Sequence, residues 1–385
     1  MASEKMQRSV ERILTTHVGS LIRPPDLVDP SSERHAAPPE LDAARLRAAV
    51  ADVVQRQVDA GIDVVNDGEY GKSGWSLYFL DRVTGFEIRK LELQPVAWLG
   101  RDLERFPDFF AQEMPDALRG QPIEACVGPI SYRGGPELAR DVDNLRQAAG
   151  GAQPREIFMT SVAPASAAYN GVNEYYASER DYVFAIAEAL REEYRAVHRA
   201  GFILQVDDAL LANMYDTLVR QSPQRYREWA ELRVAALNHA LEGIPPDRIR
   251  YHVCFGSWHV PHVADAPLEA IVDLLLEVNA QGYCIEAANA RHEHEWRVWE
   301  EVRLPADKIL IPGVVTHHTT TVEHPRLVAD RIVRFAKLVG RENVIAGTDC
   351  GFAQSRKIQR VHPSVMWAKL EALVAGAELA SAELY

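Results

Sequence analysis

The sequence alternates short runs of apolar and β-branched residues with longer amphipathic stretches along most of its 385 residues. Parallel strands joined by helices close into a (β/α)8 barrel, so we predict an α/β protein with the TIM-barrel fold. An open doubly wound sheet is the alternative, but no G-x-G-x-x-G motif follows the first run. The predicted strands are 13–20, 62–69, 156–164, 202–210, 249–255, 282–288, 308–315 and 343–351. The predicted helices are about 41–60, 178–200, 223–242, 266–280, 291–302, 325–340 and 363–380.

The stretch 71–155 interrupts this alternation. It contains aromatic residues, prolines and the turn-like sequence "SYRGGPE", and it is too long for an ordinary connection. We interpret it as an insertion that elaborates the barrel mouth after the second strand. The chain is otherwise expected to form a single catalytic domain over residues 1–385.

The overall charge of the chain is acidic. It has 42 Lys+Arg against 55 Asp+Glu, a formal net charge of −13, which disfavours nonspecific nucleic-acid binding and anionic membranes. No apolar run reaches the length of about 18 residues typical of a membrane-spanning helix, and the charged N-terminus lacks an apolar signal core. Four cysteines are too few for a disulfide framework in a chain of this size, so we expect a cytoplasmic protein with reduced thiols.

Polar residues gather at the carboxyl ends of the predicted strands, where TIM barrels carry their active sites. A single Asp or Asn at a strand end often only caps the next helix. Groups able to bind a metal occur at seven of the eight strand ends, which capping does not explain. These residues are His17, Ser20, Asn66, Asp67, Glu69, Asp207, Asp208, His252, Cys254, Glu286, His317, His318, Asp349 and Cys350.

The sequence "YHVCFGSW" places His252 and Cys254 two residues apart, and therefore on one face of a strand. Together with Glu286 and Cys350 they would form a tetrahedral zinc site. The alternative is that the cysteines are core thiols and His252 is a hydrogen-bonded core histidine. Cys284 shares the face of Glu286 one layer deeper, where a core position is expected although a ligand role remains open.

Three further features receive structural interpretations. Cys126 lies in the insertion and is expected to be structural. The sequences "HVPH" (259–262) and "HEHE" (292–295) could bind a metal, but we expect them on solvated helix or loop faces.

Seven segments occur in the order seen in the catalytic half of cobalamin-independent methionine synthase, which the chain therefore resembles. They are "ILTTHVGSLIRP", "DVVNDGEYGKSGW", "LQVDDALLA", "HVCFGSW", "CIEAANAR", "IPGVVTHHTTTVEHP" and "AGTDCGF". The resemblance implies a TIM barrel whose zinc ion binds a thiol substrate as thiolate, which then attacks an alkyl donor. A cation lowers the pKa of a thiol, so this chemistry is physically reasonable at neutral pH.

Carried over by motif, His252, Cys254, Glu286 and Cys350 resemble the zinc ligands. Ser20 and Glu69 match positions that hold the amino-acid part of homocysteine, and His17, at the same strand end as Ser20, is grouped with them. Asp207 matches a substrate-contacting aspartate. His318 matches a histidine thought to assist proton transfer to the leaving group, with the neighbouring His317 as the alternative.

The chain also departs from the family pattern. It has only the catalytic barrel, and "TSVAPASAAYN" stands where the family carries a tryptophan that stacks on the folate. We therefore expect a zinc-dependent alkyl (methyl) transferase acting on a small thiol, with a donor other than methyltetrahydrofolate. Epoxyalkane:coenzyme M transferases are single-barrel relatives that open an epoxide. The alternatives are cleavage of an epoxide or ether, a zinc-water lyase or hydrolase, and a noncatalytic binding protein.

Overall fold

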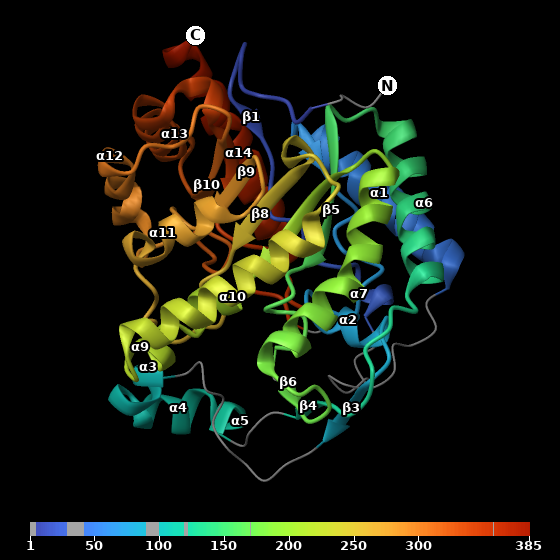
Figure 1. Cartoon of the computed structure of the whole chain (residues 1–385). Coiled ribbons are helices and arrows are strands. Elements are labelled where there is room, and N and C mark those ends of the chain that lie inside the picture. The colour runs from blue at the N-terminus through green and yellow to red at the C-terminus, as the bar shows by residue number, and fades with distance from the viewer. Residues whose placement is uncertain (1–4, 29–41, 90–99, 119–121, 170, 357) are drawn as a thin grey trace.

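The computed structural model describes residues 5–28, 42–89, 100–118, 122–169, 171–356 and 358–385. Eight strands form one parallel sheet, and the bridge between Thr16 and Val64 joins its first strand to its last, so that the sheet closes into the predicted TIM barrel (Figure 1). In sheet order the strands are β1 (Leu14–Thr15), β11 (Ile345–Thr348), β10 (Ile309–Val315), β9 (Gly282–Ile285), β8 (Ile249–Val253), β7 (Ile203–Asp208), β5 (Glu156–Val162) and β2 (Val64–Val65).

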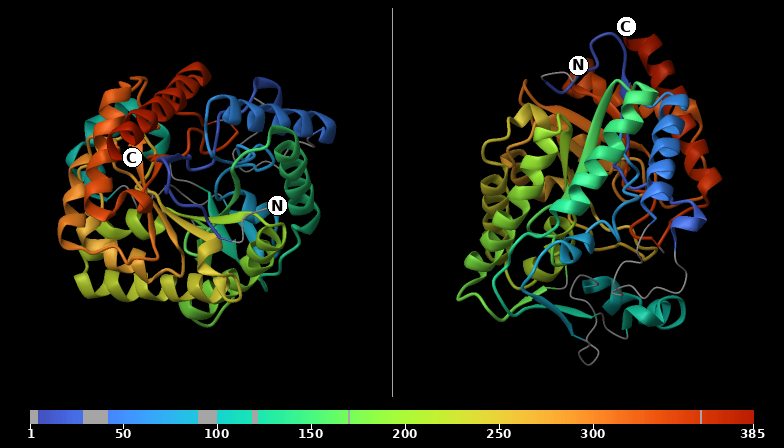
Figure 2. Two further views of the ribbon diagram at one scale, coloured as in Figure 1. Left: turned by 90° about the horizontal axis from the view of Figure 1, so that it is seen from above. Right: turned by 90° about the vertical axis from the view of Figure 1, so that its right-hand side faces the viewer.

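Helices surround the sheet, as the view from above shows (Figure 2). Several begin at a residue whose side chain accepts a hydrogen bond from a free backbone N–H, as Ser178 and Ser222 do. The expected helix 291–302 is instead a short 3₁₀ helix, η4 (Glu293–Arg297), followed by α12 (Val298–Glu301). The other outer helices are α1 (Ala43–Asp59), α6 (Gly135–Ala152), α7 (Glu179–Arg199), α10 (Pro223–Leu241), α11 (Leu268–Glu277), α13 (Pro325–Val339) and α14 (Pro363–Leu384). Within the described residues, we find no helix with the long apolar stretch that crossing a bilayer requires.

The interior of the barrel is divided into an apolar part and a polar part. The apolar part is a cluster contributed by nearly every strand and by Met6: Leu14, Val64, Phe158, Ile203, Cys284, Ile309, Ile311 and Ile345. Above it lies the buried guanidinium of Arg250, 3.5 Å from the centre of the Phe158 ring. Arg250 donates to Gln205 Oε1, Thr16 Oγ1 and the carbonyl of His17 over 2.6–2.9 Å. The polar residues at the strand ends therefore lie above a packed apolar layer, and Cys284 belongs to that layer.

The stretch expected as an insertion contains a small three-stranded sheet, built from β3 (Phe86–Arg89), β4 (Ile123–Cys126) and β6 (Gly171–Asn173). Short helices accompany it: α2 (Tyr78–Asp81), α3 (Gly100–Arg105), α4 (Pro107–Glu113) and α5 (Pro115–Leu118). Residues 90–99 and 119–121 lie outside the described residues.

The boundaries of this extra unit differ from the expected 71–155. Helix α6 packs against α1 and α7 in the outer ring, so the last part of the range is an ordinary barrel helix. Strand β6, which follows β5, joins the small sheet from outside the range. Buried Arg82 ties the two parts together by pairing with Asp141 of α6 at 2.6 Å and Glu193 of α7 at 2.9 Å.

Candidate metal centre and substrate pocket

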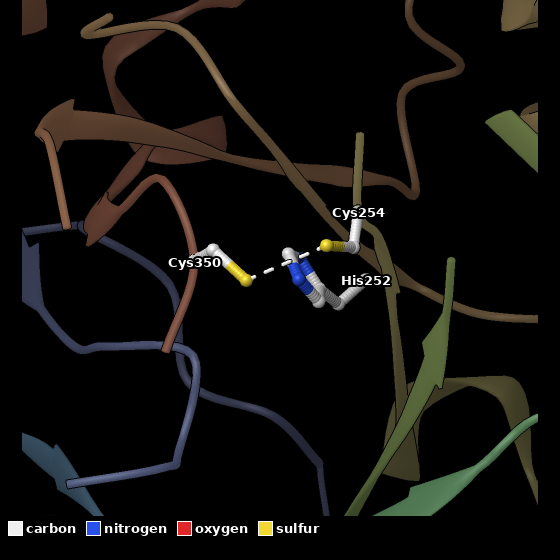
Figure 3. Close-up of side chains that lie close together, drawn as sticks. All are labelled: His252, Cys254 and Cys350. Atoms are coloured by element: carbon white, nitrogen blue, oxygen red, sulfur yellow. Dashed lines mark hydrogen bonds between the residues drawn. The ribbon is translucent and has the colours of Figure 1, made fainter. Parts of the chain in front are cut away.

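Two thiols and an imidazole converge at the carboxyl ends of the barrel strands (Figure 3). The ligand atoms of His252, Cys254 and Cys350 all lie within 4.8 Å of one another, and the two sulfur atoms are 3.6 Å apart. His252 lies on β8, Cys254 directly follows that strand, and Cys350 follows β11. The alternation of a strand turns His252 and Cys254 to one side, and barrel closure brings Cys350 to them.

The loop after β8 supports both sulfur atoms. The backbone N–H of Gly256 lies 3.4 Å from Cys254 Sγ, and the buried hydroxyl of Ser257 lies 3.4 Å from Cys350 Sγ. The sulfur–sulfur hydrogen bond lowers the pKa of Cys254 well below the ordinary thiol value and raises that of Cys350 well above it. One thiol of the pair therefore ionises much more readily than the other.

These three residues fit a thiophilic metal ion. His252 is buried, and neither of its ring nitrogens has a hydrogen-bond partner in the described part of the chain, an arrangement that is costly unless a ligand is bound. Thiolate sulfur and imidazole nitrogen are preferred ligands of zinc. Three protein ligands leave a fourth position open, as in catalytic rather than structural zinc sites.

Glu286, expected as the fourth ligand, is not part of this group of three. Both of its oxygens are engaged: Oε1 accepts from the backbone N–H of Phe255 at 3.1 Å, and Oε2 accepts from Asn289 and Arg291, each at 2.8 Å. Burial raises the pKa of Glu286 to about 7, against the opposing charge of Arg291. The structure thus places Glu286 beside the cluster as the partner of a buried arginine.

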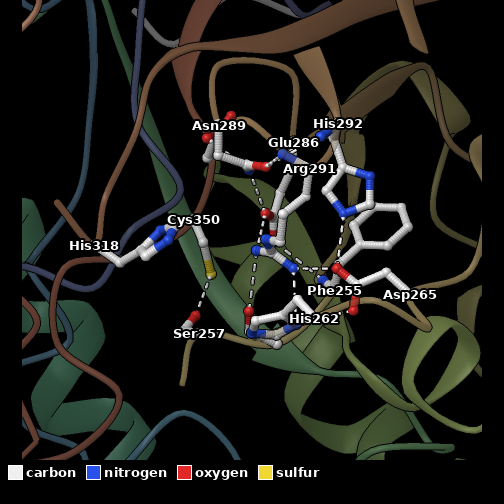
Figure 4. A network of polar contacts seen from close by, with 12 residues as sticks. Phe255, Ser257, His262, Asp265, Glu286, Asn289, Arg291, His292, His318 and Cys350 are labelled. Carbon is white, nitrogen blue, oxygen red and sulfur yellow. Dashed lines mark hydrogen bonds and ion pairs between the residues drawn. The ribbon is translucent and has the colours of Figure 1, made fainter. Parts of the chain in front are cut away.

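Arg291 connects Glu286 to a larger buried network (Figure 4). Its guanidinium also pairs with Asp265, which accepts from His262 at 2.8 Å and from His292 at 3.2 Å. The expectation that "HVPH" and "HEHE" lie on solvated faces is therefore wrong for His262 and His292, whose side chains are 7% and 2% exposed. Neither belongs to the thiol–imidazole group, and both are held by hydrogen bonds to carboxylates.

A pocket of about 500 Å³ opens directly above the cluster. Its lining includes the predicted substrate residues Ser20, Glu69 and Asp207 together with all three candidate ligands. Two tryptophans, Trp75 and Trp258, form part of its wall. Trp258 also lines a second, neighbouring pocket of about 440 Å³. The residues expected at five separate strand ends thus meet around one space.

Comparison with known proteins identifies the family of this chain. A family model described as "Cobalamin-independent synthase, Catalytic domain" matches residues 164–372, more than half of the chain. The chain belongs to this family. It is 23% identical to a methionine synthase of Thermococcus kodakarensis over 88% of this chain and 84% of the relative. It is 25% identical to the 2-hydroxypropyl-CoM lyase of Xanthobacter autotrophicus over 90% of this chain and 88% of the relative.

The fold agrees with a solved cobalamin-independent synthase. The B12-independent methionine synthase from Shewanella sp. W3-18-1, in complex with selenomethionine, superposes with a TM-score of 0.73 at 21% sequence identity. The match covers 97% of this chain and 99% of that one. This likeness supports the barrel fold described above.

Glu69 and Asp207, two residues that the family resemblance assigns to substrate, have carboxylates facing the pocket. Glu69 is buried in a left-handed backbone conformation with φ of 62°. Its Oε1 accepts from Thr160 at 2.6 Å, whereas the buried Oε2 has no partner among the described residues. Asp207 accepts from Gln205 at 2.7 Å, and burial raises its pKa to about 7. Ser20, also in the lining, donates to the carbonyl of Ala353.

The remaining family positions lie outside the pocket lining. His17 is buried, with Nε2 2.7 Å from Gln57 Oε1 and Nδ1 accepting from the N–H of Gly19. His318 is half-buried and lies 3.2 Å from the hydroxyl of Thr316, and burial lowers its pKa to about 4. Burial lowers the pKa of His317 well below its usual value. The acid role expected of His318, with His317 as the alternative, therefore stays a prediction.

Sequence reasoning missed several residues that shape the site. Ser257 and Trp258 stand within the quoted run "YHVCFGSW", where only the histidine and the cysteine were given a role. Trp75 is the last residue of the segment "DVVNDGEYGKSGW". Its position shortly after a predicted strand end was a signal that could have placed it at the site. Gln205 and Arg291 carried no signal, because their roles depend on partners from other strands.

Proposed function

We propose that this chain is a zinc-dependent transferase that alkylates a small thiol, and that it acts as a single catalytic domain. The observation that carries the proposal is the group His252, Cys254 and Cys350 at the floor of a pocket lined by Glu69 and Asp207. Membership of the cobalamin-independent synthase family supports methyl transfer to a thiol as the type of reaction. A bound zinc ion would supply the positive charge that keeps a substrate thiol ionised at neutral pH.

The site residues have separate roles in binding the metal ion and the substrate. His252, Cys254 and Cys350 hold the ion, and Glu286 stands beside them, paired with Arg291. Glu69 and Ser20 bind the polar end of the thiol substrate, since the free Oε2 of Glu69 is an acceptor in need of a donor. Asp207 orients the substrate. It lies on β7, directly opposite His252 of β8 in the register of these two strands.

His17 supports this arrangement from behind. Gln57, which contacts the His17 ring, also accepts from the N–H of Asn66 and donates to its carbonyl. His17 and Gln57 therefore fix the end of β2, from which the chain turns toward Glu69. We assign His17 a positioning role rather than direct contact with substrate.

Metal content and thiol binding test the proposal together. The purified protein should hold about one zinc ion per chain, and X-ray absorption of the zinc-loaded protein should report an added sulfur neighbour when a small thiol such as homocysteine is supplied. Cys254→Ser and Cys350→Ser should lose the ion. The matched controls Cys284→Ser and Cys126→Ser alter buried cysteines outside the group and should keep it.

Two results would overturn the assignment. Full zinc retention in both Cys254→Ser and Cys350→Ser would show that the ion is held elsewhere. Unchanged sulfur coordination with homocysteine and with other small thiols, combined with thiol-independent hydrolysis that rises with pH, would favour a lyase or hydrolase using zinc-bound water.

A further inference from the structure

We propose that the alkyl donor of this enzyme is an onium compound, a sulfonium or quaternary ammonium ion whose cationic centre lies against Trp75 and Trp258. This inference rests on the proposed function and names the substrate class of its second reactant. Three features of the pocket carry it: the sign of the charges in its lining, the two aromatic walls, and the position of the histidines.

The charged side chains in the pocket lining are acidic. Glu69, Asp207 and Asp208 contribute carboxyl groups, of which Asp207, with a pKa of about 7, is partly ionised at neutral pH, and the lining contains neither lysine nor arginine. Asp208 is fully hydrogen-bonded, to Ser166, Tyr251 and two backbone N–H groups, and Glu69 and Asp207 face the pocket. Such a pocket repels an anionic donor such as a folate with a glutamate tail, and it attracts a cation.

The nearby cations lie outside the pocket lining. Lys72 donates to the carbonyl and the hydroxyl of Thr160, each at 2.7 Å. Arg23 donates to the backbone carbonyls of Glu69 and Lys72 at 2.6 and 3.1 Å. Neither of them, nor Arg360, belongs to the lining. A thiolate bound at the cluster would add a further negative charge to the pocket.

The two tryptophans provide surfaces suited to a cation without hydrogen-bond donors. Trp75 and Trp258 are half-buried and come from opposite parts of the chain, the first from the segment after β2 and the second from the loop after β8. Trp75 is fixed by an edge-on contact with Tyr169, at 5.6 Å between ring centres. Aromatic faces attract sulfonium and quaternary ammonium groups electrostatically, and the attraction is strongest where water is excluded.

The bond changes balance without a proton donor. The thiolate sulfur forms a bond to the alkyl carbon, and the bond from that carbon to the onium sulfur or nitrogen breaks. Its electron pair stays on the leaving atom, which departs as a neutral thioether or tertiary amine. His318 lies outside the lining and its pKa is lowered to about 4, so a reaction that needs no acid matches the residues present.

Binding of unreactive cations tests the inference without turnover. Choline and its uncharged isostere 3,3-dimethylbutan-1-ol have the same shape, so their affinities for the zinc-loaded protein, measured by calorimetry, isolate the effect of charge. We expect choline to bind roughly tenfold more tightly. Trp258→Leu and Trp75→Leu should each reduce this preference, and Trp296→Leu, which alters a half-buried tryptophan outside the pocket, should leave it intact.

Turnover with different donors completes the test. With homocysteine as thiol, trimethylsulfonium, tetramethylammonium and methyltetrahydrofolate are supplied in parallel, and the first two separate sulfonium from ammonium donors. Methylation from either onium ion, reduced about tenfold or more by Trp258→Leu, supports the inference. Equal binding of choline and its isostere, or efficient use of methyltetrahydrofolate alone, overturns it. If no thiol adds a sulfur neighbour to the zinc in X-ray absorption, the proposed function itself fails.

Discussion

Replacing Arg291 by methionine should destabilise the protein strongly, because it leaves two buried carboxylates without their cation. The Arg291 side chain is 13% exposed, and its partners Glu286 and Asp265 are 0% and 17% exposed. Breaking a buried pair by removing one partner typically costs about 3–5 kcal/mol. Asp265 keeps two histidine neighbours that can carry a proton. Glu286 already has a pKa of about 7, so protonation limits the cost of its unpaired charge at pH 7.5 to about 1 kcal/mol.

We therefore expect the free energy of unfolding of Arg291→Met to fall by about 1–3 kcal/mol at pH 7.5, the usual cost of leaving buried acceptors without their donor, out of a typical total of about 5–15 kcal/mol. Urea unfolding of the metal-free protein, followed by circular dichroism, measures this directly. The matched control is Arg326→Met, which removes exposed pairs with Asp330 and Glu383 and should cost less than about 1 kcal/mol.

The pH dependence distinguishes an unpaired charge from lost packing. In Arg291→Met the pKa of Glu286 should rise further, so the folded variant binds more protons than the unfolded chain. Its deficit relative to wild type should shrink as the pH falls from 7.5 to 5. A loss below about 1 kcal/mol at pH 7.5, or a deficit that does not change with pH, would refute the view that Arg291 neutralises Glu286.

Three further outcomes follow from buried groups elsewhere in the barrel. Burial raises the pKa of Glu156 to about 7, so its ionisation opposes folding as the pH rises from 4.5 to 7. The free energy of unfolding of Glu156→Gln, measured in urea, should therefore exceed that of the wild type by up to about 3 kcal/mol at pH 8 and by nothing at pH 4. Gln205→Leu removes the amide that donates to Asp207 at 2.7 Å. Steady-state kinetics should then show a higher KM for the thiol at unchanged zinc content, and an unaltered KM would contradict the orienting role of Asp207. Removing zinc leaves the sulfur atoms of Cys254 and Cys350 3.6 Å apart, so mild oxidation should join them in a disulfide that peptide mapping detects and that zinc loading prevents.

The barrel and the thiol–imidazole group could be predicted because both follow from periodic patterns. Alternating strand and helix signals indicate the fold, and strand alternation places His252 and Cys254 on one face. Cys350 was found because all parallel strands of a barrel open at the same end, so a cysteine after β11 reaches a cysteine after β8. These arguments need only the order and direction of the strands.

The partners of charged residues could not be predicted in the same way. "HEHE" and "HVPH" are polar enough to suggest solvent, yet Arg291 and Asp265 compensate the buried His262 and His292. Such compensation depends on side chains from separate loops meeting at hydrogen-bond distance, which no spacing rule encodes. For the same reason, the pairing of Glu286 with Arg291 could not be predicted.

The apolar part of the pocket lining bears on the rate as well as on the choice of donor. When a thiolate attacks an onium ion, one negative and one positive charge both fade as the new bond forms. Water stabilises the separated charges more than the transition state, so it slows this reaction. A pocket walled by Val18, Trp75, Ala209, Trp258 and Ala353 removes part of that stabilisation from the reactants. With an epoxide or a folate, negative charge would instead build up on the leaving group and need a donor to receive it, and burial lowers the pKa of both His317 and His318. The same lining that weakens catalysis for those donors therefore favours it for a cationic one.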